Sequence, residues 1–255
     1  MSSVAFTGNI QKGGALLEDC RRVVEVWDPT KDEASNLSRI VEQGLLAKRS
    51  RTRAEDVIRR IIRPRLIDPG PHIIPALKNF LSDPQAFKEA CYFETARDET
   101  LLAAFAEGPL FEMWSDGRVG VTIQDVVDWQ IKLTAIKQLP AWTDTVRIKV
   151  ARGILAALRD FGILAGGTSK TILPPNLSPN GFSYVAWRLH EDGGSSRSLS
   201  TSNVWRLWLL DPTRVAELFR QASRLGVMSV SASGSTIRID WRAHNLQEVT
   251  SAVAR

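Results

Sequence analysis

The sequence predicts a mainly α-helical protein built from two domains. Its 255 residues are 44% hydrophobic and 24% charged, values that are typical of a folded globular protein. Apolar side chains recur at helical spacing along most of the chain, whereas alternating strand-like segments are few and short. A chain of this length suits two domains of about 100 to 150 residues, and the change of character near Gly117 favours that division.

The first helices of the chain are defined by apolar periodicity and by capping residues. Residues 14–27 repeat apolar side chains at helical spacing, and Asp28 with Pro29 ends that helix. Ser35 is a plausible N-cap for a second helix, whose apolar side includes Leu37 and Val41. We therefore expect two amphipathic helices before the first strongly basic residues.

A third helix is expected at the basic turn that follows. Thr52 and Glu55 have the spacing of a capping box, which predicts a helix over residues 53–63 with Pro64 at its boundary. Two short helices joined by a tight turn, the second basic in its first turn, are typical of a helix-turn-helix. Residues 35–65 are therefore predicted to form a helix-turn-helix-like segment.

The middle of the chain contains the predicted domain boundary. Residues 71–115 continue the helical pattern, which places a helical N-terminal domain at residues 1–117. Residues 118–122 have the character of a short strand, and Thr122 with Asp125 can cap a helix that runs to about Lys137. We therefore expect a C-terminal domain of mixed helices and short β-hairpins over residues 118–255.

A winged-helix-like segment is predicted at the start of this second domain. Thr143 is an N-cap candidate for the strongest helix of the sequence, over residues 144–161. Residues 163–173 contain Gly166 and Gly167 between two apolar runs, as in a β-hairpin. The resulting order of helix, helix and hairpin is that of a winged helix.

The rest of the chain alternates helices with one further hairpin. Helices are expected at about residues 179–190, 203–210, 212–225 and 246–254, and strands at 227–231 and 236–241. Residues 193–202 form a polar segment rich in serine and glycine, which predicts a loop.

Basic residues are concentrated between Leu46 and Arg65. Eight lysines and arginines there face only two acids, Glu55 and Asp56, so this segment carries a charge of +6 in a chain whose net charge is +5. A concentrated positive surface is what binding to a polyanion requires. The candidate DNA contacts in this segment are Lys48, Arg49, Ser50, Arg51, Thr52, Arg53, Arg59, Arg60 and Arg63.

A second, weaker basic group follows Trp142. Between Leu139 and Lys170, five basic residues oppose Asp144 and Asp160. The candidate DNA contacts in this group are Thr145, Arg147, Lys149, Arg152 and Lys170. For both groups the alternative is a solvated charged face whose arginines only pair with nearby carboxylates.

Catalytic, metal and cofactor sites are not predicted. The three histidines are isolated, no nucleophile elbow, HExxH or CxxC pattern is present, and the glycine-rich run at 166–171 follows a helix where a phosphate-binding loop would follow a strand. Cys20 and Cys91 lie far apart in apolar helical patterns, which favours a reducing compartment. With no apolar run of about 18 to 20 residues, a cytoplasmic protein without a membrane span is expected.

Several segments together resemble the BrxA family of bacterial BREX phage-defence systems. They are IQKGGALLED (10–19), GLLAKRSRTRAEDVIRRIIRPRL (44–66), YFETARDETLLAAF (92–105), KVARGILAALRDFGIL (149–164), LLDPTRVAELF (209–219) and IRIDW (237–241). The resemblance implies a mostly helical, non-enzymatic DNA-binding protein that acts beside other BREX proteins. It supplies no motif that fixes the contact residues, so the site prediction depends on the two basic groups.

The function predicted from the sequence is therefore duplex DNA binding in phage defence, mainly through phosphates and with weak sequence preference. Two alternatives stay open. One is a scaffold protein that recruits other BREX components, and the other is an RNA-binding protein, because basic helical surfaces also bind RNA by shape and phosphate contacts.

Overall fold

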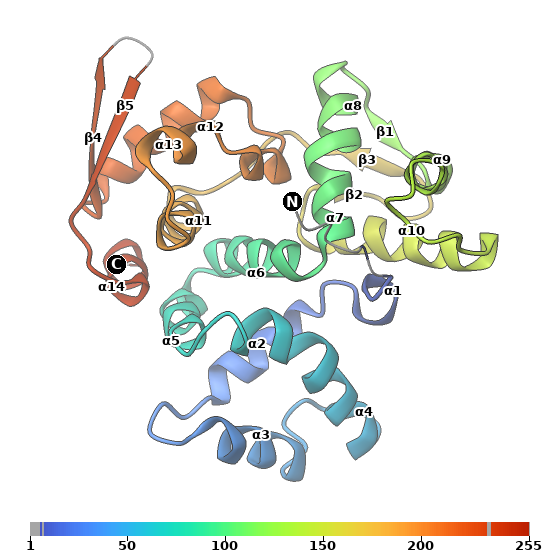
Figure 1. Cartoon of the computed structure of the whole chain (residues 1–255). Coiled ribbons are helices and arrows are strands. Elements are labelled where there is room, and N and C mark those ends of the chain that lie inside the picture. The colour runs from blue at the N-terminus through green and yellow to red at the C-terminus, as the bar shows by residue number, and fades with distance from the viewer. Residues whose placement is uncertain (1–5, 7, 234–235, 255) are drawn as a thin grey trace. The chain divides into compact units, whose positions relative to one another are not determined.

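The computed structural model describes residues 6, 8–233 and 236–254 and is mainly helical, with small antiparallel sheets (Figure 1). The predicted fold class is thus confirmed. Contacts divide the chain into two compact units, each made of three segments. The first unit comprises Met1–Ala15, Thr95–Asn176 and Asn203–Leu210, and the second Leu16–Glu94, Leu177–Ser202 and Asp211–Arg255. The domain boundary expected after Gly117 lies inside the first unit. That the segments on either side of it fold independently stays a prediction.

The second unit begins with the helices of the basic segment: α2 (Leu17–Val26), α3 (Glu33–Glu42), α4 (Arg51–Val57) and the π-helix η1 (Ile58–Ile67). Two predicted caps are wrong by a few residues. Asp32, not Ser35, caps α3 by accepting from the Ser35 amide at 2.7 Å. Ser50, not Thr52, caps α4 by accepting from the Arg53 amide at 3.2 Å. In both cases the alternative cap begins the helix earlier and satisfies one of its free N-terminal amides.

The helix of the basic segment also ends later than predicted. Pro64 lies within η1, and the helix continues to Ile67. Proline has no amide hydrogen to donate and its ring crowds the preceding turn of an α-helix. The wider π-helical turn accommodates that ring, so the chain stays helical through Pro64. Pro109 is similarly contained in the π-helix η3 (Ala106–Leu110) of the first unit.

The buried amide of Asn36 fixes the turn that enters α3. Its Oδ1 accepts from the Asp28 amide, and its Nδ2 donates to the Asp28 carbonyl, both at 2.9 Å. The same Nδ2 also lies within hydrogen-bond distance of the carbonyls of Lys31 and Asp32. A fully buried polar side chain with these bonds closes the turn between α2 and α3.

The remainder of the second unit packs helices around buried aromatic side chains. Its elements are α5 (Ile73–Lys78), η2 (Asn79–Ser82), most of α6 (Pro84–Asp98), α11 (Pro179–Glu191), α12 (Ser196–Thr201), α13 (Pro212–Arg224), β4 (Met228–Ser233), β5 (Thr236–Trp241) and α14 (Leu246–Val253). The hairpin β4–β5 is antiparallel as predicted. The predicted loop at 193–202 instead contains α12, because Ser195 caps residues 196–201 into a short helix.

The first unit combines helices with a three-stranded antiparallel sheet. Its elements are α1 (Ile10–Gly13), α7 (Thr100–Phe105), η3, α8 (Phe111–Ser115), β1 (Gly120–Val121), α9 (Ile123–Ala135), α10 (Asp144–Asp160), β2 (Leu164–Ala165), β3 (Lys170–Ile172) and η4 (Asn203–Trp208). The sheet order is β1-β3-β2. Thr122 and Asp125 form the predicted capping box, and Thr143 caps α10 as predicted.

Two close approaches fix α1 and η4 within this unit. A Cβ on Gly153 would lie 3.0 Å from the Cα of Gln11, so only glycine lets α1 pack this closely on α10. The Arg206 guanidinium of η4 lies over the Phe111 ring, 4.7 Å from its centroid. Among the described residues, no helix is both long and apolar enough to cross a membrane.

Gly181 provides a test of the packing in the second unit. A Cβ at this position would lie 2.1 Å from Oε2 of Glu89, whose carboxylate accepts from the Ser178 amide at 2.9 Å. We expect Gly181→Ala to lower the free energy of unfolding by about 1–2 kcal/mol, because overpacking outweighs the better helix propensity of alanine. Urea denaturation measures this change. Gly108→Ala, whose added Cβ would meet no atom of another segment within 4 Å, is the control, and equal stability of both variants would contradict the prediction.

Candidate nucleic-acid interface

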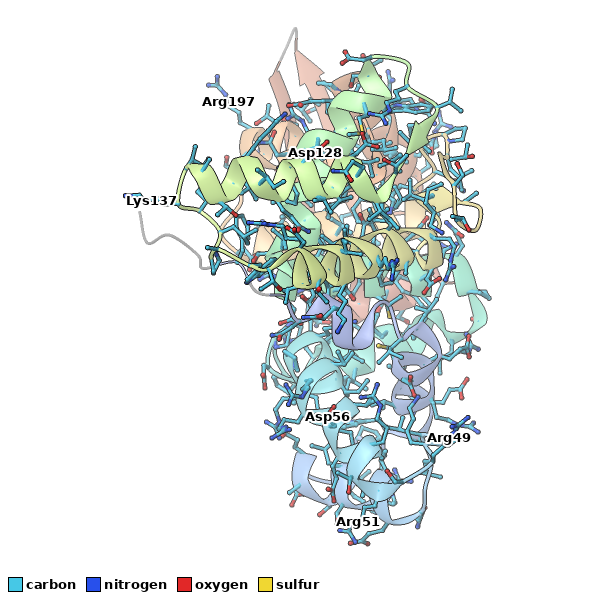
Figure 2. The ribbon with its side chains drawn as sticks, turned by 90° about the vertical axis from the view of Figure 1, so that its right-hand side faces the viewer. Arg49, Arg51, Asp56, Asp128, Lys137 and Arg197 are labelled. Atoms are coloured by element: carbon cyan, nitrogen blue, oxygen red, sulfur yellow. The ribbon has the colours of Figure 1, made fainter. Side chains whose placement is uncertain are left out.

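The first basic group lies on α4 and η1 and on the turn before them. Arg49, Arg51 and Arg53 are exposed, as are Arg59 and Arg60. Figure 2 shows the side chains of Arg49 and Arg51 extending from the surface around α3 and α4. Ser50 and Thr52 are exposed too, with Ser50 engaged as the cap of α4. The structure therefore places most of the predicted residues on one exposed part of the second unit.

Carboxylates partly neutralise this group. Asp56 accepts from Arg53 at 3.1 Å and from Arg59 at 3.2 Å, and it also pairs with Arg60. The hydrogen bond from Arg60 is the main cause that lowers the pKa of Asp56. Arg51 pairs with Glu55 at 2.9 Å. Exposed ion pairs of this kind stabilise a protein by only about 0–1 kcal/mol. They therefore orient the arginines but do not prevent them from binding another anion.

Three cations of the same segment are engaged elsewhere. Lys48 pairs with Asp19 at 2.7 Å, and that carboxylate is only 8% exposed. Arg63 pairs with Glu33 and lies 3.6 Å from Asp68, while Arg65 is fully buried. Lys48 and Arg65 thus stabilise the fold, and the positive charge open to solvent is smaller than the sequence count. Arg49 has no ion-pair partner in the part of the chain that the structure describes.

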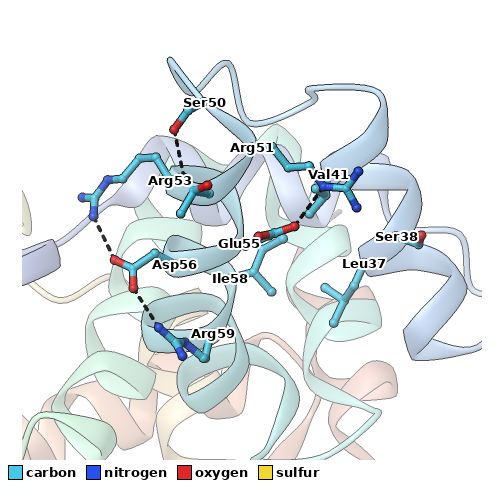
Figure 3. A pocket seen from close by; sticks show the side chains of 11 residues that line it. Leu37, Ser38, Val41, Ser50, Arg51, Arg53, Glu55, Asp56, Ile58 and Arg59 are labelled. Carbon is cyan, nitrogen blue, oxygen red and sulfur yellow. Dashed lines mark hydrogen bonds and ion pairs between the residues drawn. The ribbon is translucent and has the colours of Figure 1, made fainter.

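A groove accompanies these arginines. It has a volume of about 780 Å³ and lies between α3 and the helix formed by α4 and η1. Leu37 and Val41 of α3, with Ile58 of η1, give it an apolar wall, and Arg51 and Arg59 stand at its rim (Figure 3). Sequence periodicity assigned Leu37 and Val41 to the inner side of their helix, but both are half-exposed in this groove.

The second basic group lies on α10 of the first unit. Thr145, Lys149 and Arg152 are exposed at a spacing of one helical turn, so they form one stripe along the helix. Neither Lys149 nor Arg152 has an ion-pair partner within the described residues. Ile148, 36% exposed, lies beside this stripe. We call Thr145, Lys149 and Arg152 the α10 stripe.

The β2–β3 turn, residues 166–169, extends from the same unit. All four of its residues are exposed, and Thr168 and Ser169 present hydroxyls to solvent. The Lys170 ammonium donates to the Gly166 carbonyl at 3.0 Å and also to the Gly167 carbonyl. Lys170 is only 8% exposed. It therefore holds the turn in shape and does not present its charge, which corrects its prediction as an exposed contact residue.

Arg147 also differs from its predicted role. Its side chain is only 15% exposed and pairs with Asp144 at 3.2 Å. Helical geometry places it off the α10 stripe, on the side turned toward the core. Sequence analysis predicted the short strand within residues 118–122 but not its pairing with β3, because pairing between segments about 50 residues apart has no local signal. The predicted contact residues also left out Thr168 and Ser169. The pairing of β2 with β3 places these two residues in the exposed turn of the hairpin.

Within the described residues, no three His, Cys, Asp or Glu side chains gather as a candidate metal site. The first unit does expose two sets of polar groups, namely the α10 stripe and the hydroxyls of the β2–β3 turn. Both sets belong to a segment in which β1, α9, α10 and the β2–β3 hairpin follow one another along the chain.

Comparison with known proteins identifies the family and the fold. A family model described as BrxA matches residues 5–188, well over half of the chain. No curated protein matches the sequence. A solved structure that is similar is described as the crystal structure of an uncharacterized protein from Magnetospirillum magneticum. It is 16% identical, with a TM-score of 0.62 over 81% of this chain and 100% of that chain. At this identity the similarity supports the fold alone.

Lys170 gives a test of how the β2–β3 turn is held. We expect Lys170→Met to lower the free energy of unfolding by about 1–2 kcal/mol, because the variant has no ammonium to donate to the two carbonyls. Amide hydrogen exchange in residues 166–169 should become faster. Lys149→Met, which removes an exposed lysine from α10, is the matched control and should change neither quantity. Unchanged exchange in Lys170→Met would show that the turn does not depend on this side chain.

Proposed function

The chain belongs to the BrxA family of BREX phage-defence components, and from this premise we propose that it binds duplex DNA. The observation that carries the proposal is the α10 stripe, whose lysine and arginine are exposed and unpaired within the described residues. Cations without competing carboxylates can neutralise phosphates and release their counterions, which is the main source of non-specific affinity for DNA.

In the proposed complex, α10 acts as the recognition helix of a winged helix and the β2–β3 turn acts as its wing. A helix of this kind lies in the major groove and positions its exposed side chains near phosphates and base edges. The Thr168 and Ser169 hydroxyls, with nearby backbone amides, would contact the adjacent phosphates. Arg147 and Lys170 would support this surface from behind, and neither would contact DNA.

Sequence preference is expected to be weak. The α10 stripe carries no asparagine or glutamine to read adenine, and Arg152 is its single guanidinium for a guanine edge. Phosphate contacts then dominate the affinity. The BrxA family is not a known enzyme family, and we propose that this protein acts by binding, without catalysis.

The first basic group is a second candidate for phosphate contact. Arg49 is the best placed of its members, because it is exposed and has no carboxylate partner within the described residues. The other exposed arginines already pair with Glu55 or Asp56, and each would keep that carboxylate nearby or give it up when it binds a phosphate. They are Arg51, Arg53, Arg59 and Arg60. Their contribution to DNA affinity should therefore be smaller than the charge count suggests.

The test is fluorescence anisotropy of a labelled random duplex across a salt series. We expect Lys149→Ala/Arg152→Ala to weaken binding and to make the slope of log affinity against log salt shallower by about 0.9 for each phosphate that the variant no longer neutralises. Arg220→Ala/Arg224→Ala removes the same charge from exposed positions on α13 and is the matched control. A third variant, Arg49→Ala/Arg51→Ala/Arg53→Ala, measures the contribution of the first basic group.

Three outcomes decide between the hypotheses. Absence of duplex binding by folded wild-type protein at low salt would refute the DNA proposal. A weakening equal to that of the α13 control would refute the α10 stripe as the contact surface. Tighter binding of single-stranded or duplex RNA than of duplex DNA, in direct competition, would replace the proposal with RNA binding.

A further inference from the structure

The groove beside α4 differs chemically from a DNA-binding surface. Leu37 and Val41 lie one helical turn apart on α3, and Ile58 faces them from η1 (Figure 3). The groove volume of about 780 Å³ is within the range of sites that bind ligands. An apolar wall of this length matches side chains spaced one turn apart on another helix.

Arginines of α4 and η1 line the groove together with this apolar wall. The side chain of Arg51 is 69% exposed and uses its Nε to pair with Glu55. Arg59 is 70% exposed and uses one terminal nitrogen to pair with Asp56. Each guanidinium has five N–H donors, so both keep donors that face solvent. These free donors have the planar geometry that binds a carboxylate in bidentate fashion.

Two carboxylates make DNA a poor occupant of the groove itself. Glu55 and Asp56 line the groove together with the arginines, and both would face the closely spaced phosphates of a duplex. A duplex also has no large apolar side chain that could cover Leu37, Val41 and Ile58. An acidic peptide can avoid the repulsion and also cover the apolar wall. Its few carboxylates can be placed opposite the arginines, and its apolar side chains can fill the groove.

We propose that this groove binds an acidic amphipathic helix of a partner protein. Large apolar side chains at i and i+4 of that helix contact Leu37, Val41 and Ile58, and its flanking Asp or Glu residues pair with Arg51 and Arg59. This activity would be separate from DNA binding at the α10 stripe, because every residue of the groove belongs to the second unit and the α10 stripe belongs to the first. It gives the scaffold hypothesis a defined surface.

The experiment uses the full-length protein and a fluorescein-labelled synthetic peptide of about 14 residues, four helical turns. The peptide carries leucines at i, i+3, i+4 and i+7 and glutamate on its other face. One control peptide has the same composition in shuffled order, and a second has lysine in place of glutamate. We expect the acidic amphipathic peptide to bind at least about tenfold more tightly than either control.

Two variants test the two parts of the groove. Leu37→Ser should weaken peptide binding about tenfold and leave duplex DNA affinity unchanged, since it alters no charge. Arg51→Glu/Arg59→Glu should abolish binding of the acidic peptide and raise affinity for the lysine peptide. Arg214→Glu/Arg224→Glu on α13 makes the same charge change, and Arg214 is likewise an exposed helical arginine that pairs with a glutamate. This control should bind both peptides as wild type does, and circular dichroism confirms folding of every variant.

The outcomes separate this inference from the proposed function. Equal binding of the acidic and shuffled peptides, or no binding, would overturn the groove proposal. A fall in duplex affinity in Arg51→Glu/Arg59→Glu without any peptide binding would overturn it as well and would assign the groove to the DNA interface. Peptide binding by a protein that binds no duplex would support the groove and refute DNA binding.

Discussion

The second unit depends on a buried ion pair between Glu94 of α6 and Arg188 of α11. The Arg188 Nε donates to the Glu94 carboxylate at 2.9 Å, and the two side chains are 4% and 0% exposed. Tyr184 donates to the same carboxylate oxygen at 2.8 Å. Removing one member of such a pair leaves an uncompensated buried charge and costs about 3–5 kcal/mol. In the same unit, the buried guanidinium of Arg65 in η1 interacts electrostatically with Cys20 of α2 and Cys91 of α6. The exposed arginines of η1 therefore lie on a helix whose opposite side is buried in the core of the second unit.

Charge is used differently on the two candidate surfaces. On α4 and η1, the arginines share a small number of carboxylates, and Asp56 alone receives three of them. On α10, Lys149 and Arg152 point to solvent without such partners among the described residues. The cations of the α10 stripe have no carboxylate partner among the described residues, although exposed Asp144 precedes Thr145, whereas Glu55 and Asp56 line the groove and pair with its arginines. The net charge counted along the sequence thus overstates the positive charge that the first surface offers to a phosphate, compared with the second surface.

The sequence predicted the elements of the fold better than the state of their side chains. Strong periodicity and good caps located α10, α9 and the β2–β3 hairpin, because local preferences and tertiary packing agree there. Ser35 and Thr52 were wrong as caps because another capping residue stood two or three positions earlier, and one sequence cannot rank such neighbours. Burial of Lys170 and Arg147 was not predictable, since it depends on where the β2–β3 turn closes and on how α10 rotates against its neighbours. Pairing of Lys48 with Asp19 joins residues distant in sequence and has no local signal.

The carboxylates beside the groove arginines explain how one protein could keep two anionic ligands apart. Duplex DNA carries one negative charge for about every 1.7 Å of its axis, so a surface that mixes acids with arginines repels part of any phosphate backbone laid across it. A peptide helix can instead leave its uncharged positions opposite Glu55 and Asp56 and place its acids opposite Arg51 and Arg59. Discrimination then comes from repulsion of the wrong ligand as much as from attraction of the right one. The same two acids that lower the positive charge of the first basic group would thereby give its groove a preference that the unpaired cations of the α10 stripe do not have.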